Sequence, residues 1–350
     1  MHLRLCANPS RGNIPPMGTT TNQRLIPALP LLAALLLSTL SSSSLAQPTT
    51  QPSAGYVFTY FLNNGEDGLH LATSTDGLHW QVVANGQSFL KPTVGKEKLM
   101  RDPCVLLGPD GVYRLVWTDS WTDRTIGYAS STDLIHWSAE TAVPVMAAEP
   151  TALNTWAPEV HYDPVNKHYV IFWASTIPGR FAATDASGDK APNDQHYNHR
   201  IYSTTTTDFM TFTPTRLYFD PGFDCIDATL IPINNRICLI FKDETLTPLK
   251  KNLRLAWADT MDGPYTDVSD PFTRQWVEGP TAIQIGDQTI VYFDCYRDHH
   301  YGAMRSKDMK TWEDITDKIA MPPGIRHGTV IAVPPEIMKS LADASPVQAP

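Results

Sequence analysis

Five short motifs place polar, mostly acidic residues directly before apolar runs that are typical of strands. In order they are Arg101-Asp102-Pro103, Trp156-Ala157-Pro158-Glu159, Ile226-Asp227, Glu278-Gly279-Pro280 and Arg326-His327-Gly328. A proline fixes its own φ and disfavours the helical region for the residue before it, so we expect Asp102 to be extended at the mouth of a strand. Polar residues at five strand starts predict one ring of strands that opens onto one site.

Convergent carboxyl groups in a cleft are the arrangement that glycoside hydrolysis requires. One ionised carboxylate activates a water molecule, and a second carboxyl group with a raised pKa protonates the leaving oxygen. A third carboxylate nearby raises the pKa of its neighbour, because like charges disfavour ionisation. Each motif alone could equally be a turn, since Asp-Pro and Glu-Gly-Pro are common turn formers.

A turn motif with a following aromatic residue repeats along the chain at spacings that are typical of propeller blades. In three copies a serine is followed by an aspartate and then by a tryptophan, and looser copies occupy 206–212 and 258–265. We expect the aspartates to cap turns and the tryptophans to pack within blades: Asp76, Asp133 and Asp308; Trp80, Trp137 and Trp312.

Between these turns lie short β-rich runs without helical periodicity, which predicts an all-β fold. Radial repetition buries such units economically, so we predict a five-bladed β-propeller over 55–335. The unit that begins at Tyr56 has no leading acid, and the strand after His327 has no partners of its own. We therefore expect the N- and C-terminal strands to pair and close the ring, with residues 336–350 as a tail.

The N-terminal region resembles a targeting segment, because Arg24 precedes an apolar run and Ser44-Leu45-Ala46 is a small-x-small cleavage pattern. We predict a signal peptide over 1–46, with Met17 as a possible true start, then a linker over 47–54. A membrane anchor is the alternative. The mature protein is expected to be exported, to the periplasm or the extracellular space.

The composition narrows the class of partner. The formal net charge is −9 and no basic run occurs, which argues against nucleic acid or, after signal removal, a membrane as a partner. Four cysteines follow the predicted signal peptide, an even number that permits disulfides without defining their pairing. They are Cys104, Cys225, Cys238 and Cys295.

Together the motifs resemble those of glycoside hydrolase family 43, a family of five-bladed propellers, from about Tyr56 to Val333. The resemblance implies that Asp102 is the general base, Asp227 the pKa-modulating aspartate and Glu278 the general acid. It also implies that His327 faces the channel, next to a possible structural calcium ion or water; no cofactor is otherwise expected. The chain departs from the family pattern at Ala228, where many members have proline, and in a long insertion over 178–199.

Positions in the ring support the same roles, because Asp102 and Glu278 begin blades on opposite sides and Asp227 begins a blade next to Glu278. Burial and Asp227 should raise the pKa of Glu278 and keep this acid protonated near neutral pH. Four further residues are expected to bind substrate: Arg101, Trp156, Glu159 and Arg297. Trp156 could instead pack in the core, Glu159 could form a salt bridge at the rim, and Arg297 could pair with Asp298.

Three functions are compatible with these residues. The leading hypothesis is an inverting glycosidase that acts on arabinofuranosyl or xylosyl linkages of plant cell-wall polysaccharides or oligosaccharides. The second is a galactosidase or galactanase on the same fold. The third is a carbohydrate-binding propeller without catalysis, which the presence of all three acids disfavours.

Overall fold

The computed structural model describes residues 55–191 and 195–344. The predicted signal peptide over 1–46, the alternative start at Met17 and the linker over 47–54 lie outside the described residues. Within the described part of the chain, no helix is both long and apolar enough to cross a membrane.

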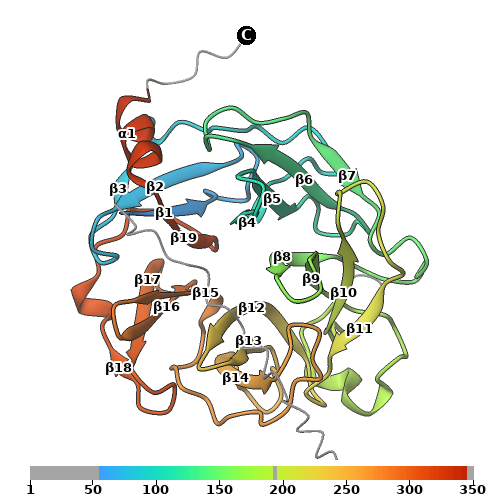
Figure 1. Ribbon diagram of the computed structural model, residues 1–350. Helices are drawn as coiled ribbons and strands as arrows, with labels where there is room; N and C mark the ends of the chain where they lie inside the picture. The colour runs from blue at the N-terminus through green and yellow to red at the C-terminus, as the bar shows by residue number, and fades with distance from the viewer. Residues whose placement is uncertain (1–54, 192–194, 345–350) are drawn as a thin grey trace, which may run out of the picture. The chain divides into compact units, whose positions relative to one another are not determined.

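Five antiparallel sheets form the blades of a propeller around one channel (Figure 1). From the channel outward, blade 1 contains β19 (Thr329–Val333), β1 (Gly55–Tyr60), β2 (His70–Ser74) and β3 (Gln81–Val82). Blade 2 contains β4 (Arg101–Leu107), β5 (Tyr113–Thr118), β6 (Ile126–Ser131) and β7 (Thr141–Val143). Blade 3 contains β8 (Trp156–Asp163), β9 (His168–Ser175), β10 (Arg200–Thr206) and β11 (Arg216–Phe219).

Blade 4 contains β12 (Cys225–Ile233), β13 (Arg236–Asp243) and β14 (Asn252–Ala258). Its outer edge carries only an isolated bridge between Trp257 and Thr266. Blade 5 contains β15 (Glu278–Ile285), β16 (Gln288–Cys295), β17 (His300–Ser306) and β18 (Glu313–Asp314). The predicted five-bladed all-β propeller is therefore confirmed.

The two ends of the described chain close the ring. Strand β19 pairs antiparallel with β1, from Gly55 opposite Val333 to Thr59 opposite Thr329, and Figure 1 shows the red strand beside the blue one. The Thr59 hydroxyl accepts a hydrogen bond from the Thr329 amide at 3.2 Å and donates one to the Pro103 carbonyl at 2.8 Å. The predicted pairing of the terminal strands is confirmed, and Thr59 ties it to blade 2.

The repeated aspartates cap turns, as predicted. Oδ1 of Asp76 accepts hydrogen bonds from the amides of Leu78 and His79, and the same pair of bonds recurs at Asp133, Asp208 and Asp308. Trp80 is buried, while Trp137 and Trp312 are partly buried against the apolar clusters between blades. In four blades these turns therefore connect the third strand to the outermost strand.

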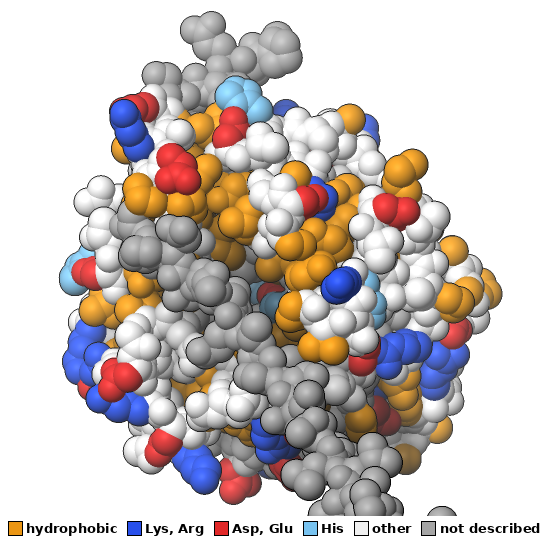
Figure 2. Space-filling view, viewed as in Figure 1, with side chains coloured by type: hydrophobic (Ala, Val, Ile, Leu, Met, Phe, Trp, Pro, Cys, Tyr) orange, Lys and Arg blue, Asp and Glu red, His pale blue; other side chains and the backbone are white. Residues whose placement is uncertain are grey.

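Apolar side chains fill the spaces between blades, and charged side chains lie mainly around the rim of the face drawn in Figure 2. All four cysteines of the described chain are buried and free, so none forms a disulfide. The segment expected to be a tail begins with helix α1 (Pro335–Asp343), in which Ile337 and Leu341 are buried against blades 1 and 2. Packing of the propeller thus continues beyond residue 335.

Removal of the closing strand should unfold the whole propeller. A chain that ends at Arg326 loses β19 and α1, and it leaves β1 as an open sheet edge. We expect this truncation to abolish cooperative thermal unfolding, measured by circular dichroism. A chain that ends at Ala344 keeps both elements and is the matched control; equal melting temperatures for the two chains would contradict this account of ring closure.

Candidate active site

A β-bulge interrupts the start of the innermost strand in blades 2 to 5. In each blade the pairing register shifts across two residues, the first of which has a positive φ: 52° at Asp102, 47° at Ala157, 51° at Asp227 and 58° at Gly279. The expectation that Asp102 is extended is therefore wrong, because the bulge imposes a left-handed conformation that proline alone does not predict. Bulges of this kind re-aim side chains beside active sites.

The bulge defines which residues are equivalent from blade to blade. The position before it is occupied by Arg101, Trp156, Ile226 and Glu278, and Arg326 takes the corresponding place before β19, where its amide donates to the Phe61 carbonyl at 3.1 Å and His327 follows it. The left-handed position then holds the aspartates of blades 2 and 4. Two adjacent positions per blade therefore supply the functional groups at the mouth of the channel.

These positions line one cavity of about 550 Å³. Seven of the eight residues predicted for the site are brought together there: Asp102, Asp227, Glu278, His327, Arg101, Trp156 and Arg297. Sequence reasoning missed several other lining residues, including Trp121, Asp189, Lys242, Glu244, Lys251, Trp276 and Arg326. The cavity thus combines carboxylates, cations and indole rings.

Glu159 is the predicted residue that the structure places elsewhere. It lies after the bulge of blade 3, two residues beyond the left-handed position, and its side chain is 3 % exposed. Its Oε2 accepts a hydrogen bond from Thr229 Oγ1 at 2.9 Å and lies 2.8 Å from His161 Nε2. These contacts join blades 3 and 4 away from the cavity lining, which corrects the expected substrate contact. The alternative of a salt bridge is met by the pairing with His161, but Glu159 is buried and does not lie at the rim.

Asp102 is held as a carboxylate by two neighbours. Thr118 Oγ1 donates to its Oδ2 at 2.8 Å, and His327 Nδ1 lies 3.2 Å from its Oδ1. Burial alone would raise the pKa of Asp102, but the hydrogen bond and charge of His327 lower it to about 2. Burial likewise opposes ionisation of His327, whose pKa is raised to about 9 mainly by Asp102. At neutral pH the two side chains form an ion pair.

Glu278 contacts two cations. Lys242 Nζ donates to its Oε2 at 3.0 Å, and Arg326 Nη2 donates to its Oε1 at 3.2 Å. Burial favours the neutral acid, but Lys242 and then Arg326 outweigh it and lower the pKa of Glu278 below its usual value of 4.5. The expectation of a raised pKa at Glu278 is therefore wrong in the ligand-free site, because a buried lysine from blade 4 faces it.

Among Asp102, Asp227 and Glu278, Asp227 is the acid whose pKa is raised. Burial is the main cause, and the charges of Glu278 and Asp102 add to it, although His327 and Lys242 act in the opposite direction. Its Oδ2 accepts a hydrogen bond from the Gly279 amide at 2.9 Å. Asp227 therefore fixes the backbone that follows Glu278, in keeping with an orienting role.

A row of alternating charges continues from Glu278 across the cavity wall. Glu244 Oε2 lies 2.6 Å from Lys242 Nζ, and its other oxygen pairs with Lys251. Lys251 Nζ also contacts Asp189 Oδ2 at 2.5 Å, in the long insertion over 178–199. The sequence signal that could have predicted this row is Lys242, near the end of the buried apolar strand β13, because a buried lysine requires charged partners.

Indole rings of blades 2 and 3 also line the cavity. Trp156 lines the cavity, donates through Nε1 to the Trp121 carbonyl at 2.9 Å, and packs against Tyr197 and His199 with ring centroids 4.7 and 5.0 Å away. Trp156 is half-buried and lies outside the apolar core clusters of the described residues, so of its two alternatives the structure favours the one in which the ring faces the channel. Such a ring is a suitable platform for a sugar.

The side chains around His327 do not fit a calcium ion. Calcium takes six to eight oxygen ligands, whereas the nearby carboxylates of Asp102 and Glu278 are already engaged by protein donors. A protonated imidazole also disfavours a cation beside it, whether the cation is bound directly or through water. The contact with Asp102 accounts for His327 without a metal.

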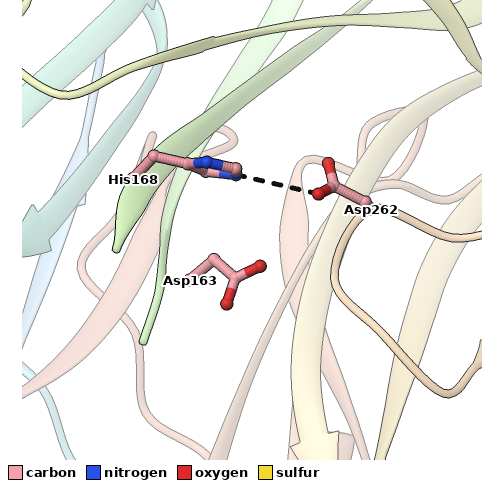
Figure 3. A group of neighbouring side chains, drawn as sticks. All are labelled: Asp163, His168 and Asp262. Atoms are coloured by element: carbon pink, nitrogen blue, oxygen red, sulfur yellow. Dashed lines mark ion pairs between the residues drawn. The ribbon is translucent and has the colours of Figure 1, made fainter. Parts of the chain in front are cut away.

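Three possible metal ligands lie close together elsewhere, at the boundary of blades 3 and 4: Asp163, His168 and Asp262 (Figure 3). Asp163 already accepts bonds from the amides of Val165 and Asn166, and Asp262 pairs with Arg216 at 2.7 Å. His168 lies 3.8 Å from Asp262. These contacts describe a turn cap and an ion pair between blades, and no metal is inferred there.

Comparison with known proteins agrees with this architecture. Residues 51–337 match a family related to glycoside hydrolase family 43 and described as "Probable glycosyl hydrolase domain". The chain belongs to this family. It is 28% identical over 272 residues to an α-L-arabinofuranosidase of Bifidobacterium longum subsp. longum, a match that covers 67% of the chain and 25% of that relative. The chain therefore spans about a quarter of the length of that relative.

Two solved structures are similar to this chain over part of its length. The α-L-arabinofuranosidase from Lactobacillus brevis has a TM-score of 0.47 and 17% identity, with coverage of 61% of this chain and 72% of that one. The exo-β-1,3-galactanase from Phanerochaete chrysosporium has a TM-score of 0.47 and 12% identity, with coverage of 67% and 54%.

Gly279 is a test of how tightly the site is built. A Cβ at this position would lie 2.4 Å from His327 Cγ, and φ is also positive. Gly286 has a φ of 62°, and a Cβ there would meet no atom within 4 Å, so it is a control for backbone strain alone. We expect Gly286→Ala to lower the free energy of unfolding by about 1 kcal/mol. Gly279→Ala should cost clearly more in urea denaturation; equal costs would contradict the close approach to His327.

Proposed function

We propose that the chain is an inverting glycoside hydrolase that removes arabinofuranosyl or xylosyl groups from plant cell-wall polysaccharides or oligosaccharides. The observation that carries the proposal is the meeting of Asp102, Asp227 and Glu278 in one cavity of a family 43-type propeller. Similarity to the α-L-arabinofuranosidase of Bifidobacterium longum supports an arabinofuranosyl group, more than a xylosyl group, as the part of the substrate that is removed.

In the proposed reaction, Asp102 takes a proton from a water molecule that attacks the anomeric carbon. Its low pKa keeps it ionised for this step, and Thr118 and His327 fix its orientation. Glu278 gives a proton to the glycosidic oxygen as the bond between carbon and oxygen breaks. The sugar leaves with inverted configuration, and the two carboxyl groups then exchange protons with solvent to reset the site.

Asp227 and Lys242 act on Glu278 in opposite directions. When Asp227 is ionised, its negative charge disfavours ionisation of Glu278. The hydrogen bond that Asp227 accepts from the Gly279 amide orients Glu278 through the backbone. Lys242 stabilises the ionised form of Glu278. Glu278 is therefore protonated in only a small fraction of free enzyme at neutral pH, and the proposed reaction is favoured in acid.

The substrate class is tested by release of the aryl group from arabinofuranosides, xylosides and galactosides, followed by assays on polysaccharides. We expect aryl α-L-arabinofuranosides to give the highest kcat/KM. Hydrolysis of galactosides alone would replace the arabinofuranosyl proposal with the galactosidase alternative. Sugar binding without hydrolysis of any of these substrates would favour a binding propeller.

The catalytic roles predict different responses to leaving groups. Glu278→Gln should reduce kcat on unactivated oligosaccharides by about 100-fold or more, the usual range for loss of a general acid. It should affect activated aryl glycosides far less, because a good leaving group needs no proton. Asp102→Asn should reduce both about equally. If Glu278→Gln impairs both substrate types alike, the assignment of Glu278 as proton donor is contradicted.

The pH dependence follows from the two shifted carboxyl groups. The value of kcat/KM should fall as pH rises through the pKa of Glu278, which lies below 4.5, because the proton donor ionises. It should also fall as pH drops towards about 2, because the base Asp102 becomes protonated. We therefore expect a bell-shaped profile with an acidic optimum.

Lys242→Gln should move the alkaline limb of this profile to higher pH, since it removes the main charge that keeps Glu278 ionised. Lys307→Gln, which removes an exposed lysine paired with Asp287, is the control and should leave the profile unchanged. Thermal melts verify that both variants are folded. An unchanged limb in folded Lys242→Gln protein would contradict the role given to Lys242.

A further inference from the structure

The lysine and arginine side chains that line the cavity fall into two groups. Lys242, Lys251 and Arg326 are each paired with carboxylates: Lys242 with Glu278 and Glu244, Lys251 with Glu244 and Asp189, and Arg326 with Glu278 and Asp294. Arg101 and Arg297 form no ion pair with any carboxylate of the described residues. The charge of these two guanidinium groups is therefore available to a ligand.

Arg297 is the more open of the two. It is exposed, it follows β16 at the rim of the cavity, and its guanidinium carbon lies 3.1 Å from the centroid of the Trp276 ring. The adjacent acid, Asp298, is engaged by Arg274 at 2.6 Å. The alternative in which Arg297 pairs with Asp298 is thus wrong, and the structure leaves Arg297 facing the cavity.

Stacking prepares Arg297 for a planar anion. A guanidinium group that lies over an indole ring keeps its N–H groups directed outward in its own plane, where they match the two oxygens of a carboxylate. The platform is itself held in place: Trp276 has a φ of 65°, an uncommon conformation for a bulky residue, and its amide donates to the Lys251 carbonyl at 2.7 Å. The backbone conformation therefore fixes the position of the Trp276 ring beneath Arg297.

Arg101 has the same design on the other side of the channel. Its guanidinium carbon lies 4.1 Å from the ring centroid of Trp121, and Nη1 donates to Asn64 Oδ1 at 3.2 Å. The same Asn64 oxygen accepts a hydrogen bond from Trp121 Nε1 at 2.9 Å. The Arg101 guanidinium group therefore has more protein contacts than that of Arg297. Arg297 is therefore the better candidate for a ligand contact.

We propose that Arg297 on Trp276 forms a subsite for the carboxylate of a uronic acid residue in the saccharide bound by this cavity. The inference rests on the proposed function and deepens it, because it assigns the substrate to acidic saccharides. Glu278 and Arg297 lie at the same, open end of the hairpin β15–β16, where Glu278 pairs with Asp294, so the uronic acid residue occupies a position next to the bond that is cleaved.

Binding tests the subsite without reliance on catalysis. Titration of the protein with D-glucuronate and D-galacturonate, each compared with its methyl ester, should show that at least one free acid binds more tightly than its ester. We expect a difference of about tenfold or more, as for a charge-assisted bidentate hydrogen bond. Arg297→Gln should abolish the difference, and Arg297→Lys should retain part of it, because lysine keeps the charge but not the planar fork.

Arg305→Gln is the matched control, because it removes an arginine of the same blade that is paired with Glu313. It should leave the preference for the acid intact. Equal binding of acids and esters by the unaltered protein would overturn the proposal, and so would an Arg297→Gln variant that weakens both equally.

Kinetics then separate this proposal from the proposed function. On an acidic arabinosylated oligosaccharide and its methyl ester, loss of Arg297 should raise KM for the acid with little change in kcat. Binding that depends on Arg297 in a protein without glycosidase activity would retain the subsite and refute the hydrolase. Hydrolysis with no preference for the acid over its ester would retain the hydrolase and refute the subsite.

Discussion

The pairing of β19 with β1 is the constraint on which the site depends. Arg326 and His327 are separated from β19 by Gly328 alone, and ring closure brings them beside Glu278 and Asp102, respectively. Blade 1 lies between blades 2 and 5, so its closing strand also separates the two carboxyl groups that the proposed reaction requires. The last strand of the propeller therefore completes both the fold and the chemistry.

A second constraint is that buried charges need partners, because an unpaired charge in a buried cavity is strongly disfavoured. The cavity wall meets this demand with a continuous row from Glu278 through Lys242, Glu244 and Lys251 to Asp189. The same pairing has a chemical consequence, since it stabilises the ionised form of Glu278. The pairing that stabilises the wall therefore opposes protonation of Glu278, and the predicted acidic pH optimum of the proposed reaction follows from this opposition.

Much of this architecture could be predicted from sequence because the propeller repeats its signals. The turn aspartates, the strand-leading acids and the orphan last strand each have a local pattern, and the meeting of Asp102, Asp227 and Glu278 in one cavity was predicted in this way. The role of Glu159 was not, because the bulge adds a residue to the strand and changes which side chains reach the mouth of the channel. Contacts between blades were also beyond local patterns: Lys242 and Glu278 are 36 positions apart, so the burial of Glu278 was foreseen and its cationic neighbour was not.

The most direct test is the configuration of the first sugar released. Because Asp102 is the proposed base for a water molecule, hydrolysis should invert the anomeric carbon. Proton NMR of an early reaction, recorded before mutarotation, should show the opposite anomer to that of the substrate. A product that retains the anomeric configuration would contradict the central claim that Asp102 acts on water across the channel from Glu278.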